Sequence, residues 1–141
     1  MADTDIDLWP ADLAELPVHS PVSLLRKQAE ALSRKTGNAI LARVETVEYR
    51  HRLYSSGAVL WDPDFAHRLV LTVPRLEGYT MVLLTIYQKL NNYPVAAAMS
   101  DSDEAAVILN DEDALAAWLR AAFASPRTRQ VFSTLMSIAA A

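Results

Sequence analysis

The 141-residue sequence contains no cysteine. This absence excludes disulfide bonds, thiolate catalysis and cysteine-based zinc sites. Glycine is scarce as well, and each of the three glycines (Gly37, Gly57 and Gly78) fits a helix cap or a turn. A glycine-rich phosphate-binding loop is therefore missing, as are the nucleophile elbow of hydrolases and the His-Glu-x-x-His zinc motif. We expect a protein that is not an enzyme.

Long hydrophobic runs are also missing, although hydrophobic residues make up 52% of the chain. The longest run, Met81 to Tyr87, is too short to cross a membrane and contains Thr85. The N-terminal residues lack the basic start and apolar stretch of a signal peptide. We expect a cytoplasmic protein that does not associate with a membrane.

Positive charge is absent from the first 16 residues. They hold five acidic side chains and no Lys or Arg, whereas the rest of the chain holds 13 basic and 12 acidic side chains. A protein that binds a phosphate backbone normally has a clustered basic surface. Nucleic acid is therefore not an expected partner. The five acidic residues are Asp3, Asp5, Asp7, Asp12 and Glu15.

The same N-terminal segment has no helical or strand period, so we divide the chain into an acidic, hydrophobic arm (1–18) and one domain (19–141). Pro10 and Pro17 interrupt the arm. Trp9 lies in it among polar residues, where a lone Trp is often an anchor, either in the groove of a partner or on its own domain. The sequence leaves both alternatives open.

Three helices are predicted in the domain. Ser20-Pro21 opens the first, over 21–36, because Ser caps a helix and Pro suits its first position. Asn110 is expected to cap the second helix, and Ser125-Pro126 opens the third. The apolar residues of these helices recur at helical spacing.

Strands are predicted between the first and second helices. Residues 38–49 change apolar phase at Val47, as a β-bulge would produce. Residues 79–88 are apolar on both faces and predict a central strand. Other segments with strand character are 58–61, 65–73, 93–99 and 105–109, separated by turn residues. Tight turns favour an α+β fold: an antiparallel sheet of about five strands, with the N-terminal helix and two C-terminal helices packed on it.

Four aromatic residues have the spacing of core residues rather than of a base-stacking surface. They are Trp61, Tyr79, Tyr87 and Trp118.

The strongest candidate for a binding surface follows the first strand. A period of two residues places Arg50, Arg52 and Tyr54 on one face, with Arg68 alongside on a neighbouring strand. Such a patch would bind an acidic partner, a carboxylate or a phosphate. Two alternatives remain: a solvent-exposed face on which Glu45 and Glu48 pair with the arginines, and a surface that receives the acidic arm of this chain or of a second copy.

Two histidines and two aspartates form a weaker candidate, for a metal site. Asp62, Asp64 and His67, joined by His51, carry metal-ligand chemistry, but aspartates beside proline commonly build turns. We expect no metal and no cofactor. A small ligand-binding domain or enzyme that uses His51, His67 and Arg68 on a concave sheet face is kept as an alternative.

Size, acidity and a sheet flanked by helices resemble the profile of small bacterial immunity proteins, antitoxins and type III secretion chaperones. The sequence carries no motif of these families, and the secretion chaperones place a helix between their third and fourth strands where this chain has only Lys89 to Asn92. The leading hypothesis is a non-enzymatic protein-binding module such as an immunity protein or antitoxin. A chaperone-like partner protein and a homodimer are alternatives.

Overall fold

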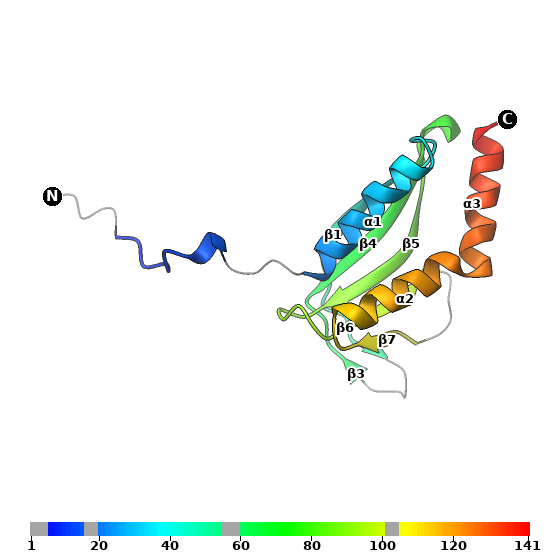
Figure 1. Ribbon diagram of the computed structural model, residues 1–141. Helices are drawn as coiled ribbons and strands as arrows, with labels where there is room; N and C mark the ends of the chain where they lie inside the picture. The colour runs from blue at the N-terminus through cyan, green and yellow to red at the C-terminus, as the bar shows by residue number, and fades with distance from the viewer. Residues whose placement is uncertain (1–5, 16–19, 55–59, 101–104) are drawn as a thin grey trace.

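A computed structural model of the chain describes residues 6–15, 20–54, 60–100 and 105–141. The predicted strand at 58–61 lies partly outside these residues, and the turn residues 55–57 and 101–104 lie outside them. Figure 1 shows a sheet with three helices on one side and an N-terminal arm that extends away from it. The helices are α1 (Pro21–Lys35), α2 (Glu112–Ala124) and α3 (Pro126–Ala139). The strands are β1 (Leu41–Glu48), β2 (Leu53–Tyr54), β3 (Leu60–Trp61), β4 (Phe65–Val73), β5 (Tyr79–Gln88), β6 (Val95–Met99) and β7 (Val107–Leu109), with short 3-10 turns at Leu13–Glu15 (η2) and Pro74–Leu76 (η3).

The two Ser-Pro pairs begin helices as predicted. The Ser20 hydroxyl accepts a hydrogen bond from the backbone N–H of Ser23, and Ser125 does the same for Thr128. These bonds satisfy N–H groups that have no partner within the helix. Helix α1 ends one residue before its predicted end, and Gly37 follows with a φ of 59°, the left-handed conformation that glycine tolerates.

The cap of α2 was predicted one residue too early. Asp111, rather than Asn110, caps the helix, because its Oδ1 accepts from the N–H of Ala114 at 2.8 Å. Asn and Asp are equally good caps, so adjacent candidates do not fix where a helix begins.

The main sheet has the order β1-β4-β5-β6-β7, and every neighbouring pair is antiparallel. This confirms the predicted five-stranded α+β architecture and places β5 at its centre. Pro94 precedes the first residue of β6, which is an inner strand, so this proline marks a strand start. The described residues 89–94 that join β5 to β6 form no helix.

The predicted bulge in the first strand is wrong. β1 pairs with β4 without interruption from Leu41 to Glu48, and beyond the strand Tyr49 packs its ring against Tyr87. The register shift lies instead between β4 and β5, where Leu69 pairs with Leu84 and Val70 pairs with Val82. Leu83 is the extra residue, and the shift allows both Leu83 and Leu84 to join the core.

The main core lies between the sheet and the helices, where α1 packs on β1 and β4 and α2 packs on β7. Leu25, Leu71, Leu84, Ile86 and Leu115 are among its fully buried side chains. A burial of this extent is the main favourable contribution to folding.

A smaller cluster lies around Trp61, which is buried as predicted and packs with Ala96 and Ala106. This cluster brings the β2–β3 pair against the main sheet. Tyr79, by contrast, is 49% exposed, because it is the first residue of β5 and lies at an exposed strand end. None of the described helices is long and apolar enough to cross a membrane.

Candidate functional site

A groove separates α1 from α2 and α3 on the helical side of the sheet. It consists of two hollows, of about 550 and 240 Å³, which share Gln28 and Phe123. Leu69 and Leu83 of the central strands line the smaller hollow. The groove is therefore an apolar channel between helices. The sheet forms the bottom of its smaller hollow.

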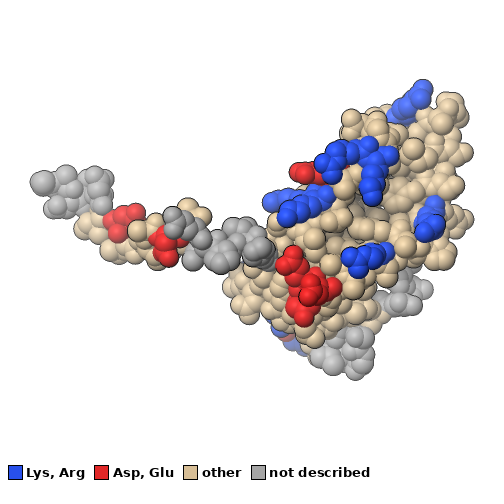
Figure 2. Space-filling model, in the orientation of Figure 1, with Lys and Arg blue, Asp and Glu red and all other residues tan. Residues whose placement is uncertain are grey.

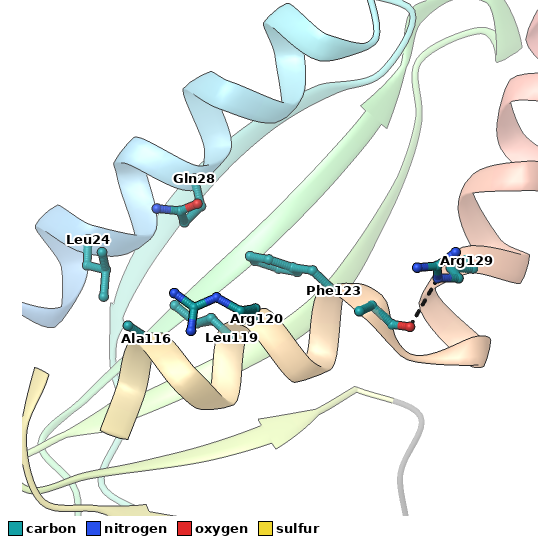
Figure 3. Close-up of a pocket in the computed structure, with 8 residues that line it drawn as sticks. Leu24, Gln28, Ala116, Leu119, Arg120, Phe123 and Arg129 are labelled. Atoms are coloured by element: carbon teal, nitrogen blue, oxygen red, sulfur yellow. Dashed lines mark hydrogen bonds between the residues drawn. The ribbon is translucent and has the colours of Figure 1, made fainter. Parts of the chain in front are cut away.

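The residues that line the groove recur at helical spacing along α1 and α2. Leu24, Gln28 and Lys35 lie on one side of α1, and Ala116, Arg120 and Phe123 lie on the facing side of α2. Figure 3 shows Leu24 and Gln28 across the gap from the residues of α2, with the Phe123 ring directed into the space between the helices. Residues three or four positions apart share a helix face, so each wall is a continuous stripe.

Basic side chains surround this apolar channel. Arg120 and Arg129 line the larger hollow and Lys35 lines the smaller one, whereas no acidic residue of the described chain lines either. Figure 2 shows blue side chains around the hollow between the helices. A groove of this kind favours a ligand that combines apolar groups with negative charge.

The cations around the groove have no carboxylate partner among the described residues. Arg120 and Lys35 form no ion pair with any described residue, and Arg129 donates its Nε–H to the carbonyl of Ala124 at 3.1 Å. Exposed cations without a carboxylate partner are available for an anion from another molecule.

Acidic residues gather at one end of α2, near the red surface in Figure 2. Asp111, Glu112 and Asp113 begin the helix, where they complement the positive end of its dipole. Burial, together with Glu112 and Asp111, raises the pKa of Tyr93 to about 12, and its buried hydroxyl has no hydrogen-bond partner among the described residues. Tyr93 therefore stays protonated at neutral pH.

The predicted arginine face is not a single surface. Arg50 pairs with Glu48 at 2.5 Å, Arg52 with Asp62 at 3.0 Å, and Arg68 with Glu45 at 3.4 Å. The period of two residues fails because residues 49–52 lie outside any strand, although Tyr54 belongs to β2.

The outer face of the sheet instead holds a short charge network. Glu45 accepts from Arg68 and lies 3.9 Å from Arg43, which also donates to the hydroxyl of Thr72. Arg43 was not among the predicted site residues. Of the expected ion pairs, Arg68 pairs with Glu45 and Arg50 pairs with Glu48, whereas Arg52 pairs with Asp62 instead.

His67 lies on the opposite, helix-covered face and is only 5% exposed. Its Nε2–H donates to Oε1 of Gln88 at 2.7 Å, so Nδ1 carries no proton and accepts from the hydroxyl of Thr46 at 2.8 Å. Burial lowers the pKa of His67 below its ordinary value, the hydrogen bond to Gln88 opposes this effect, and the charge of Arg26 adds to it. His67 is a neutral structural link across β1, β4 and β5.

The three residues of the ligand-binding alternative do not converge. His67 and Arg68 are consecutive in β4 and point to opposite faces of the sheet. His51 is exposed and packs its ring against Tyr49 at a centroid distance of 5.1 Å. Within the described ranges, no three His, Asp or Glu side chains gather as a metal site.

The arm exposes its apolar side chains. Trp9 is 73% exposed and Leu8 is 89% exposed, while the backbone N–H of Trp9 donates to Oδ1 of Asp7 at 2.9 Å. Figure 1 shows the described part of the arm away from the helices and the sheet. An exposed indole in an acidic segment has the character of a binding element.

Sequence reasoning missed the groove and its basic residues. A signal was present, because Leu24, Gln28 and Ala31 form a second stripe beside the core stripe of Leu25 and Ala29. The sequence does not give the separation between α1 and α2, and that separation decides whether the second stripe is covered.

The fold and the groove together define a small antiparallel α+β protein with an open interhelical channel. Comparison of the chain with protein-family models, curated proteins and solved structures finds no match.

Proposed function

We propose that this protein is a non-enzymatic protein-binding module, of the kind represented by bacterial immunity proteins and antitoxins, and that the groove between α1 and α2 is its binding surface. The observation that carries the proposal is the combination of an apolar channel with the basic side chains of Arg120, Arg129 and Lys35. The occupant is an apolar, acidic segment of another protein.

The shape of the groove supports a peptide segment. Its larger hollow holds about 550 Å³, lined by apolar residues of both helices, which is the size of a pocket that encloses a large side chain or a small ligand. Its length along α1, from Leu24 to Lys35, is about 16 Å at 1.5 Å per residue. An extended segment of about five residues fits this length.

The charge pattern supports an acidic partner. Basic residues around an apolar centre accelerate the encounter with a negatively charged protein and fix its orientation. Arg50, Arg52 and Arg68 are already paired with carboxylates of the same chain and offer less to such a partner. The groove is therefore the better site for recognition.

A matched pair of charge reversals tests the proposal. The tagged full chain is purified from its host, proteins that co-purify are identified by mass spectrometry, and their affinity is measured with purified components by calorimetry. Arg120→Glu reverses an exposed charge in the groove, whereas Arg75→Glu reverses an exposed charge in η3, outside it. We expect Arg120→Glu to weaken binding by about tenfold or more and Arg75→Glu to leave it within about twofold.

Equal binding by both variants would show that the partner binds elsewhere. Circular dichroism and thermal melting of both variants check that the fold is retained, because neither side chain is buried.

A further inference from the structure

The N-terminal arm has the chemistry that the groove requires. Its sequence contains five acidic and no basic side chains, and its described apolar residues Ile6, Leu8 and Trp9 are 70%, 89% and 73% exposed. The groove has the opposite charge and an apolar lining. We propose that the arm of one copy binds in the groove of a second copy, so that the chain forms an arm-exchanged homodimer; this inference rests on the proposed peptide-binding groove.

The lengths of the two surfaces agree. Residues 10–13 form a turn in which the N–H of Leu13 donates to the carbonyl of Pro10, and opening this turn would let Asp7 to Asp12 span about 17 Å, close to the roughly 16 Å from Leu24 to Lys35 along α1. Trp9 lies between these two aspartates, so its indole enters the apolar channel while the carboxylates meet the basic side chains. The backbone N–H of Trp9 donates to Oδ1 of Asp7, so this carboxylate is fixed against the backbone from which the indole projects.

The described part of the arm lies apart from the groove of its own chain. Ser20 is extended, with φ −88° and ψ 152°, and Pro21 is the first residue of the helix. Figure 1 shows the described part of the arm on the side of the α1 N-terminus that faces away from α2 and α3. No described arm residue lines the groove of the same chain, so the groove is open to the arm of a second copy.

The exchange is closed and symmetric. Each copy gives one arm and receives one, so the two contacts are equivalent and related by a two-fold axis. Binding of the first arm raises the effective concentration of the second, which strengthens the pair beyond a single contact. A foreign protein that binds the groove would compete with the arm.

Reciprocal charge reversal tests the exchange with the full chain. One variant carries Asp7→Lys and Asp12→Lys in the arm, and the other carries Arg120→Glu and Arg129→Glu in the groove. Sedimentation velocity from nanomolar to high micromolar concentration measures the mass of each variant and of an equimolar mixture. In the mixture, the lysine arm meets the acidic groove and the native arm meets the native groove.

We expect the wild-type chain to have twice the mass of one chain at micromolar concentration. The dissociation constant of each charge variant alone is expected to rise by at least about tenfold, and the mixture is expected to form dimers again. Trp9→Ala is expected to weaken the dimer to a similar extent, whereas Leu90→Ala, at an 80% exposed position outside the groove, leaves it unchanged.

Three results would overturn the exchange. A wild-type monomer at every concentration would mean that the arm is unbound or binds its own groove. A dimer that persists in both charge variants and in Trp9→Ala would place the interface elsewhere, for example at the exposed edge of β1. Failure of the mixture to form dimers would mean that arm and groove do not meet.

The exchange and the proposed function can fail separately. If Arg120→Glu loses a foreign partner while the wild-type chain is monomeric, the groove binds protein but not the arm. If the mixture forms dimers while no foreign partner depends on Arg120, the groove serves self-association alone.

Discussion

The two faces of the sheet use arginine in opposite ways. On the outer face, Arg68 is paired with Glu45, and near it Arg52 is paired with Asp62. On the helical side, Arg120 stands at an apolar groove with no ion pair among the described residues. A count of arginines therefore does not locate a binding surface; the decisive property is whether carboxylates of the same chain already neutralise them.

A substitution in the core beneath the helices is expected to lower the stability of the fold most. Leu84→Ala removes a fully buried side chain and is expected to lower the free energy of unfolding by about 2–5 kcal/mol. Thr72→Ala, on the half-buried outer face, is expected to cost less than about 1 kcal/mol. Urea denaturation at pH 7 measures both. Equal losses would contradict the assignment of the main core to the helical side.

The second prediction concerns the neutral histidine on the helix-covered face. His67→Leu leaves Oε1 of Gln88 without its donor and is expected to cost about 1–3 kcal/mol at pH 7. The native pKa of His67 lies below the ordinary value of about 6.5, so the unfolded chain binds this proton first as the pH falls. The contribution of the neutral histidine is therefore complete above about pH 6.5 and is lost as the pH falls toward the native pKa.

The variant should lack this part of the pH dependence. Urea midpoints for wild type and His67→Leu are compared from pH 7.5 to pH 5, with exposed His51→Leu as the control. If the wild-type and His67→Leu curves stay parallel, His67 does not titrate as described.

The smallest expected effect is on the outer face. Arg68→Ala removes an arginine that is paired with a half-exposed carboxylate, and exposed pairs contribute about 0–1 kcal/mol. We expect a loss of stability within that range that shrinks at high salt, and no loss of partner binding. If Arg68→Ala loses partner binding at unchanged stability, the partner binds the outer face of the sheet and not the groove.

Much of the fold could be predicted from local chemistry. Ser20-Pro21 and Ser125-Pro126 mark helix starts because a hydroxyl cap and a proline act on neighbouring residues. The apolar residues on both faces of 79–88 predicted the central strand. These features depend on a few adjacent residues, so packing of the rest of the domain does not change them.

The errors lie where distant segments decide the outcome. Arg50 and Arg52 were assigned to one strand face, but β1 ends at Glu48 and each arginine has its own carboxylate. Asn110 and Asp111 are equivalent caps until packing sets the start of α2. The groove depends on the placement of α1 relative to α2, which no single segment encodes.

The most direct test of the groove is the binding of a fluorescent peptide of residues 1–18 to the full chain. The receptor carries Trp9→Ala so that its own arm does not compete, and fluorescence anisotropy is measured at low salt. We predict saturable binding that is weakened by about tenfold or more when Arg120→Glu is added and is retained when Arg75→Glu is added. Equal affinity for both receptors, or no binding to either, would contradict the assignment of this groove as the site for an acidic, apolar segment.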